Sequence, residues 1–177
     1  MKNGWNIVKI QTMANRYWNP AAAANWNVTS SWAEVDGGAT GFSVPTSSDN
    51  VFFTSTNNNN CTINVTSNCA DINFGDYSGT LGGSNQLNCY GSFVLSSTMT
   101  RSWTGNLAFM ATTTGNIINL NRKTLQSGSL YFSGSGEYTL TNDFTNSSSP
   151  IYFQKGTFNT GNYNITCGDI YYKGPSL

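Results

Sequence analysis

The side chains best able to do acid–base chemistry in this sequence are its eight carboxylates, because histidine is absent. Two carboxyl groups about 5 to 9.5 Å apart, one with a raised pKa, form the arrangement that hydrolyses glycosidic bonds. Two pairs are close enough along the chain to share a turn, Asp71 with Asp76 and Glu137 with Asp143. Acidic residues in turn-rich stretches usually hydrogen-bond their own backbone. We therefore interpret the carboxylates as turn residues and expect no catalytic residues and no enzymatic activity.

The remaining potential ligands do not predict a metal site. The four cysteines, Cys61, Cys69, Cys89 and Cys167, lack the Cys-x-x-Cys spacing of zinc sites. Calcium needs several oxygen ligands in one loop, and the acidic residues are scattered. We therefore expect no metal and no cofactor. Free, small, buried thiols are the favoured interpretation of the cysteines, because proteins assembled in the cytosol rarely form disulfides. Their even number leaves disulfide bonding open.

The composition of the 177-residue chain fits one domain and excludes several classes of protein. Lys and Arg total 8, and Asp and Glu total 8, so the net charge is zero and nucleic-acid binding is not expected. Only 9% of the residues are charged, against about 25% in ordinary domains, whereas Asn, Ser and Thr make up 68 residues. No secretory signal is recognisable, and no apolar run approaches the roughly 18 residues of a membrane span.

An apolar–variable–apolar triplet recurs from about residue 61 onward and is the main evidence on the fold. A period near 20 residues with three short strands is typical of one turn of a parallel β-helix. We therefore predict an all-β, right-handed parallel β-helix (β-solenoid) of about five to six coils, with an antiparallel β-sandwich or jelly roll as the alternative. A looser apolar series runs through Leu81, Leu95, Ile118, Leu140 and Phe158. The triplets are Ile72-Asn73-Phe74, Leu87-Asn88-Cys89, Leu107-Ala108-Phe109, Leu130-Tyr131-Phe132, Ile151-Tyr152-Phe153 and Ile170-Tyr171-Tyr172.

Three regions follow from this pattern. Residues 1–13 are predicted to be an N-terminal extension or anchoring segment. Residues 14–56 hold Trp18, Trp26 and Trp32, and we expect this Trp-rich region to cap the first coil. Residues 57–177 are predicted to form the solenoid repeats. The sequence stops directly after a strand of the main series, so we expect the solenoid to continue beyond residue 177.

A resemblance to a known family rests on motifs that occur in a fixed order. They are Arg16-Tyr17-Trp18, Asn25-Trp26-Asn27, Trp32, Gly37-Gly38-Ala39, Val44-Pro45-Thr46 and Asp49-Asn50-Val51-Phe52-Phe53. This order resembles the β-solenoid module of virion structural and tail-fibre-like proteins of tailed bacteriophages, especially marine ones. It is more weakly similar to the autotransporter-type passenger repeats of bacterial surface proteins. One departure is the run Asn19-Pro20-Ala21-Ala22-Ala23-Ala24, where a Gly-rich turn would be expected.

The resemblance implies a structural role and brings no catalytic residues. We expect a non-enzymatic component of a virus particle, such as a phage tail fibre, spike or other appendage that projects toward the host surface. Its location would be the virion, after assembly in the host cytoplasm. The expected partners are other virion proteins, further copies of the chain (a trimer by analogy) and a host cell-surface glycan, with no nucleic acid or membrane. The alternatives are a bacterial adhesin passenger segment and the front part of a glycan-degrading tailspike.

Two groups of residues are candidates for contact surfaces. The middle residues of three consecutive triplets, Tyr131, Tyr152 and Tyr171, are predicted to form an outward-facing ladder. Such a ladder could stack on sugars, contact another subunit or simply stabilise neighbouring strands. Trp5, Tyr17 and Trp18 are predicted to belong to a region that attaches the chain to the virion.

Overall fold

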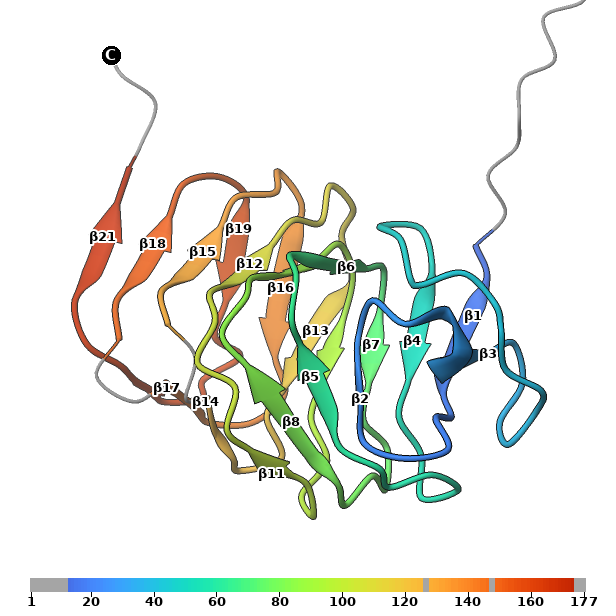
Figure 1. Cartoon of the computed structure of the whole chain (residues 1–177). Helices are drawn as coiled ribbons and strands as arrows, with labels where there is room; N and C mark the ends of the chain where they lie inside the picture. The colour runs from blue at the N-terminus through green and yellow to red at the C-terminus, as the bar shows by residue number, and fades with distance from the viewer. Residues whose placement is uncertain (1–12, 126–127, 147–148, 174–177) are drawn as a thin grey trace, which may run out of the picture.

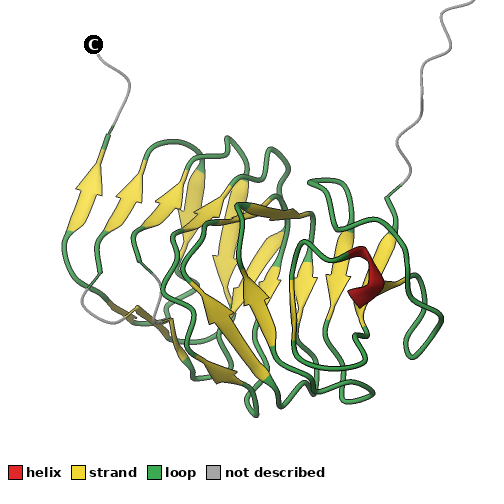
Figure 2. Cartoon of the chain, in the orientation of Figure 1, coloured by secondary structure: helices red, strands yellow, loops and turns green. Residues whose placement is uncertain are grey.

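The computed structural model of the chain describes residues 13–125, 128–146 and 149–173. Strands follow one another in short steps and wind into a stack of about six turns, so the predicted β-solenoid is confirmed (Figure 1). Every strand pair within the described ranges is parallel except one, which rules out the antiparallel sandwich. Among the described residues, the only helix is a single 3-10 turn, η1 (Thr29–Ser31), as Figure 2 shows.

One face of the solenoid is an eight-stranded sheet that collects every third strand. Its order is β19-β16-β13-β10-β7-β4-β1-β3. Only the last pair, β1 with β3, runs antiparallel. The bounds are β1 (Asn15–Trp18), β3 (Trp32–Ala33), β4 (Asn50–Phe52), β7 (Ile72–Asn73), β10 (Phe93–Val94), β13 (Asn116–Asn119), β16 (Glu137–Leu140) and β19 (Thr157–Asn159).

The second face is divided between two sheets. The N-terminal turns contribute the order β11-β8-β5-β2, and the C-terminal turns contribute β14-β17-β20. The bounds are β2 (Ala24–Asn25), β5 (Cys61–Ile63), β8 (Thr80–Gly83), β11 (Thr100–Arg101), β14 (Thr124–Leu125), β17 (Phe144–Asn146) and β20 (Ile165–Thr166).

The third face is a six-stranded sheet in the order β21-β18-β15-β12-β9-β6. This sheet contains most of the triplet repeat, and its strands keep the triplets in register. The bounds are β6 (Ser67–Cys69), β9 (Leu87–Cys89), β12 (Leu107–Phe109), β15 (Leu130–Phe132), β18 (Ile151–Phe153) and β21 (Ile170–Tyr172).

The core runs along the axis of the stack because strand side chains alternate between the inside and the outside. In the six-stranded sheet the inward residues of successive turns include Leu87, Leu107 and Leu130, all fully buried. Stacked rings continue the column, with the centroids of Phe109 and Phe132 4.8 Å apart. No single turn could bury these residues alone, so the stacking of turns supplies the stability.

One triplet was assigned to the wrong face by the sequence pattern. Residues 72–74 begin in β7 of the eight-stranded sheet, and the first strand of the six-stranded sheet is β6. The prediction was wrong because β6 begins with Ser67, an inward-facing polar residue that breaks the apolar pattern. The looser series also mixes faces, since Leu81 lies in β8 whereas Ile118 and Leu140 pair in the eight-stranded sheet.

Residues 14–56 contribute strands to the first turns and also close that end of the stack. β1 and β4 pair in parallel, and β3 then crosses back antiparallel to β1. The indole rings of Trp18, Trp26 and Trp32 are buried together, with centroid distances of 5.1 Å and 4.9 Å from Trp32 to the other two. We call these three residues the Trp plug.

Candidate functional site

The outer face of the six-stranded sheet contains the predicted tyrosine ladder. The register aligns Asn68, Asn88, Ala108 and then the three tyrosines in one row along the stack. The rings of Tyr131 and Tyr152 are 5.0 Å apart and nearly parallel, at 10°. Tyr152 and Tyr171 stack at 5.0 Å and 13°. The three side chains thus form a continuous stack, and its role as a contact surface stays a prediction.

A small hollow interrupts the row at Ala108. Its volume is about 360 Å³, and Ala108, only 3% exposed, forms its floor. On one side stands Tyr131, whose other ring face is covered by Tyr152. On the opposite side is the amide of Asn88, which accepts a hydrogen bond from Gln86 Nε2 (2.6 Å) and donates one to Asn68 (3.0 Å). The remaining lining residues are Met110 and Ser133.

The lining of this hollow determines what it can bind. It offers one aromatic ring face, a thioether, a hydroxyl and two amides, and it contains no charged side chain. Aromatic faces pack against the apolar face of a ring, and amides and hydroxyls exchange hydrogen bonds with neutral polar groups. Ala108 is only 3% exposed, so its neighbours already cover most of the position where a ring is missing, and the hollow lies beside Tyr131. We call these six residues the Ala108 hollow.

At the open end of the stack, Tyr171 differs from the other two tyrosines. Its hydroxyl donates a hydrogen bond to Asp169 Oδ2 at 3.2 Å. The neighbouring negative charge disfavours ionisation of the phenol, so the pKa of Tyr171 is raised above its ordinary value. The ring remains 47% exposed. Tyr171 is therefore a neutral phenol at the edge of the described structure.

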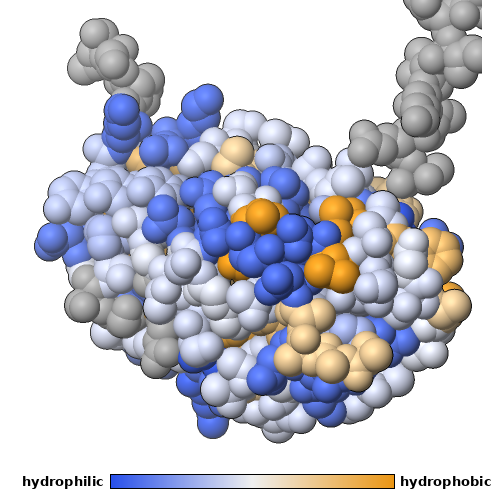
Figure 3. Space-filling model, in the orientation of Figure 1, coloured by the Kyte–Doolittle hydropathy of each residue, from blue (hydrophilic) through white to orange (hydrophobic). Residues whose placement is uncertain are grey.

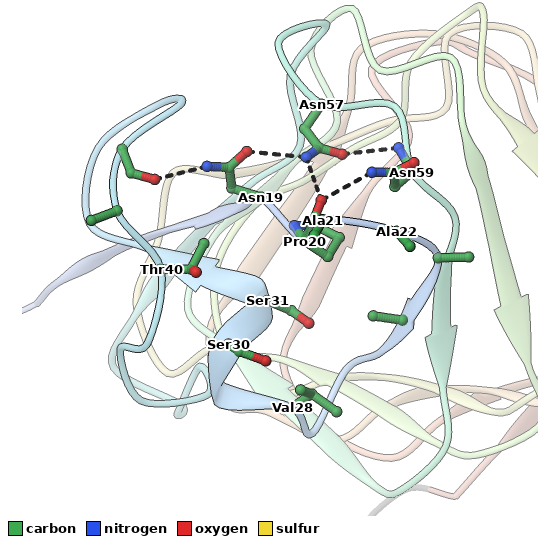
Figure 4. A pocket seen from close by; sticks show the side chains of 14 residues that line it. Asn19, Pro20, Ala21, Ala22, Val28, Ser30, Ser31, Thr40, Asn57 and Asn59 are labelled. Atoms are coloured by element: carbon green, nitrogen blue, oxygen red, sulfur yellow. Dashed lines mark hydrogen bonds between the residues drawn. The ribbon is translucent and has the colours of Figure 1, made fainter.

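A second, larger hollow lies between η1, which carries Ser30 and Ser31, and the loop that carries Asn57 and Asn59 (Figure 4). Its volume is about 810 Å³, and loops around the alanine run at residues 21–24 line it. The amides at its rim bond to one another and to backbone: Asn57 Nδ2 contacts Asn19 Oδ1 (3.0 Å) and the Pro20 carbonyl (2.8 Å), and Asn59 Nδ2 also donates to Pro20 (2.9 Å). These groups hold the first loop in place, and the lining has no ionisable side chain.

The structure describes two of the three residues predicted to attach the chain to the virion. Trp18 is 1% exposed, and its Nε1 donates to the Asn59 carbonyl (2.8 Å), so it is a core residue and its assignment to a contact surface was wrong. Tyr17 is half-buried and stacks on Phe52 at 4.9 Å. Trp5 lies outside the described residues.

Two of the carboxylates, Asp71 and Asp143, join consecutive turns of the solenoid. Asp71 Oδ1 accepts a hydrogen bond from the Ser92 backbone N–H (2.6 Å), and Asp143 Oδ1 accepts one from the Asn164 N–H (2.9 Å). Asparagine does the same within the Asn57–Asn60 run, where Asn60 Oδ1 accepts from the Thr80 N–H (2.9 Å). The partners lie 20 or 21 residues apart, one turn along the stack. For Asp71 and Asp143 the expected bond to the residue's own turn is thus replaced by a bond to the next turn, whereas Asp49 makes the expected bond, accepting from the Thr46 backbone N–H at 2.8 Å.

Replacing Asp71 with asparagine should leave the free energy of unfolding nearly unchanged, because the amide oxygen can still accept from Ser92. Asp71→Ala should lower that free energy by about 1–2 kcal/mol, since it leaves a backbone N–H without its partner. Urea denaturation of the three proteins measures both effects. An equal loss in both variants would contradict the assignment, because it would show that the charge matters and not the acceptor.

The cysteines differ in exposure. Cys61, Cys69 and Cys89 are buried and Cys167 is partly exposed, and the described structure contains no disulfide between them. Burial raises the pKa of Cys61 and Cys69, and burial together with Asp169 raises that of Cys167. A thiol with a raised pKa holds less reactive thiolate at neutral pH.

A thiol reagent should therefore label one cysteine, Cys167, in the folded protein and all four after denaturation. Labelling of Cys167 at pH 7.5 should be slower than labelling of a free cysteine and should accelerate as the pH rises toward 10, because the thiolate fraction grows. Mass spectrometry of the labelled peptides measures this order. Rapid labelling of Cys61 or Cys69 in the native protein would contradict the buried placement.

No group of three or more His, Cys, Asp or Glu side chains that could hold a metal ion occurs within the described ranges. One ion pair is present in the same part of the chain, between Arg16 and Glu34 at 3.6 Å. No helix in that part of the chain has the length and apolar character needed to cross a membrane.

The fold makes the chain a β-solenoid protein. Comparisons with protein-family models, curated proteins and solved structures found no match.

Proposed function

We propose that the chain is a non-enzymatic structural segment of a virus particle, in a phage tail fibre, spike or related appendage that faces the host. The observation that carries this proposal is the architecture itself. A stack of turns with a continuous core is closed at one end by the Trp plug, and side-chain hydrogen bonds from Asn and Asp residues join the turns. Such a stack is stiff along its axis because each turn packs on the next.

The placement of the acidic residues supports a role without catalysis. Asp71 and Asp143, one from each pair considered for glycoside hydrolysis, accept backbone hydrogen bonds from the next turn. Those bonds support a structural role for these two carboxylates. The surface in Figure 3 is largely hydrophilic or neutral, with separate hydrophobic patches, as suits a protein surrounded by water.

Immunogold microscopy tests the location. Antibodies raised against the purified chain should decorate an appendage of tailed particles released from cells that carry the gene. Decoration of the bacterial envelope without particles would overturn the proposal in favour of an adhesin. Incubation of the purified chain with host capsule, followed by a reducing-end assay, tests for the tailspike alternative. Released sugar ends would contradict a non-enzymatic role.

We further propose that the Ala108 hollow binds one neutral sugar ring of a host glycan, stacked on Tyr131. Its size and uncharged lining support a small neutral ligand. Ala108→Tyr would complete the ladder and fill the hollow, so it should abolish glycan binding while leaving the fold intact. Ala108→Ser is the matched control and should retain binding. A glycan array with the three proteins measures this, and unchanged binding by Ala108→Tyr would exclude the site.

A further inference from the structure

Two of the four cysteines lie side by side in the core. Cys69 in β6 and Cys89 in β9 are register partners in neighbouring parallel strands, and both side chains are fully buried. Cys61 lies in β5 and Cys167 follows β20, and both of those strands belong to other sheets. The fold therefore brings together one pair of thiols, with one cysteine from each of two consecutive turns.

The two sulfur atoms lean into the space between their strands. Cys69 Sγ lies 3.7 Å from the carbonyl oxygen of Asn88 in the next turn. Cys89 Sγ lies 3.4 Å from the carbonyl oxygen of Ala70 in the preceding turn. Burial, and after it the neighbouring Cys89 thiol, raises the pKa of Cys69. Each sulfur thus contacts the backbone of its partner's strand and lies beside the other sulfur.

The spacing of the strands suits a disulfide bond. Neighbouring strands lie about 4.8 Å apart, which falls within the roughly 4.4–6.8 Å between Cα atoms that a disulfide spans. All four cysteines are free thiols in the described structure, so this is the reduced form of the pair. We infer that Cys69 and Cys89 form an oxidation site, at which a small-molecule disulfide such as oxidised glutathione converts the two thiols into a disulfide bond between consecutive turns.

The reaction balances over two exchange steps. The thiolate of one cysteine attacks oxidised glutathione, forms a mixed disulfide and releases the first glutathione thiolate. The thiolate of the second cysteine then attacks the protein sulfur of the mixed disulfide. The bond between the two cysteines forms, and the second glutathione thiolate leaves. The two cysteine protons pass to the two released thiolates, and the two electrons lost by the pair reduce one oxidised glutathione to two thiols.

Burial determines when this reaction can take place. A thiol with a raised pKa holds little thiolate, and neither sulfur is open to solvent, so the attack requires the two turns to separate locally or to be still incompletely stacked during folding. The thiol buffers of the cytosol keep such a pair reduced, and the bond forms when the chain meets an oxidising environment. The inference rests on the register of β6 and β9 and does not depend on the proposed function.

The bond would join two turns of the stack covalently. It closes a loop of about 20 residues, which lowers the entropy of the unfolded chain and thereby stabilises the folded one. The oxidised chain should therefore melt about 5–10 °C above the reduced chain. Thermal denaturation followed by circular dichroism, with and without reductant, measures this difference.

Mass spectrometry tests the pairing itself. The full chain with Cys167→Ser, which removes the partly exposed thiol, is refolded from urea in a buffer that contains mainly oxidised glutathione. Free thiols are then alkylated after denaturation. Only Cys61 should be alkylated, and digestion should release a peptide pair linked through Cys69 and Cys89. Alkylation of all three cysteines, or a bond that includes Cys61, would overturn the inference.

Serine variants in the same background separate the bond from other effects of oxidation. Cys69→Ser should melt at the same temperature in its oxidised and reduced preparations, because no bond can form. Cys61→Ser, at a cysteine that is also buried in a strand, is the matched control and should keep the full difference. Comparing the two preparations of each protein removes the cost of the serine itself. A linked chain that melts below its reduced form would overturn the inference, because the bond would then require distorted turns.

Discussion

Truncation of Trp32 to alanine should lower the free energy of unfolding by about 3–5 kcal/mol. The side chain is fully buried and packs edge-on against Trp18, Trp26 and Phe53. Its Nε1 also donates to the Trp26 carbonyl at 2.8 Å, in a fully buried hydrogen bond. The substitution would thus leave a cavity and an unpaired carbonyl at the end that closes the stack.

Urea denaturation followed by circular dichroism measures this loss. Trp32→Phe should lose less, about 1–2 kcal/mol, since an aromatic ring remains and only the hydrogen bond and part of the ring are removed. Val35→Ala, in the adjoining exposed loop, should change the free energy of unfolding by less than about 0.5 kcal/mol. A Trp32→Ala protein as stable as the unmodified chain would show that the plug does not stabilise the solenoid.

Gly83→Ala should destabilise the protein by about 3 kcal/mol or more. Gly83 lies opposite Ile63 in the β5–β8 pair and has φ of +106°, a conformation that residues with a Cβ rarely adopt. An added Cβ would also overlap the Ile63 carbonyl oxygen of the preceding turn. The backbone would have to move apart at a place where two turns are hydrogen-bonded.

Two further glycines separate the contribution of the positive φ from the contribution of the steric overlap to this loss of stability. Gly115 has φ of +82° and open space around it, so Gly115→Ala should cost only the conformational part, about 1–2 kcal/mol. Gly105 has no positive φ, but an added Cβ would overlap the Asn85 carbonyl oxygen. Gly105→Ala should therefore cost only the steric part. If Gly83→Ala were no worse than Gly115→Ala in thermal denaturation, close contact between turns would not be the cause.

The solenoid could be predicted because its repeat is carried by large apolar residues. Leu87, Leu107, Leu130 and Ile151 all point inward from the same face and pair in register, so their spacing equals one turn. The pattern failed where the inward residue is polar, as at Ser67. Strand alternation within β1 would have identified Trp18 as buried, because Tyr17 beside it faces outward.

The bonds between turns could not be predicted in the same way. Each joins a side-chain oxygen to a backbone N–H about 20 residues later, and a backbone group has no sequence signature. The turn length varies as well, so the partner of a given Asn or Asp is not fixed by counting. The Ala108 hollow was missed for a related reason: a small residue is informative only beside Tyr131 and Asn88, which lie 23 and 20 residues away.

The antiparallel β3 strand and the Trp plug cover the N-terminal end of this stack. Each turn is held only by its neighbours, so a turn with one neighbour opens more easily than a turn with two. Amide hydrogen exchange in β1, which has β4 on one side and β3 on the other, should therefore be as slow as in the inner strands. The tryptophans should be among the last parts of the described structure to loosen.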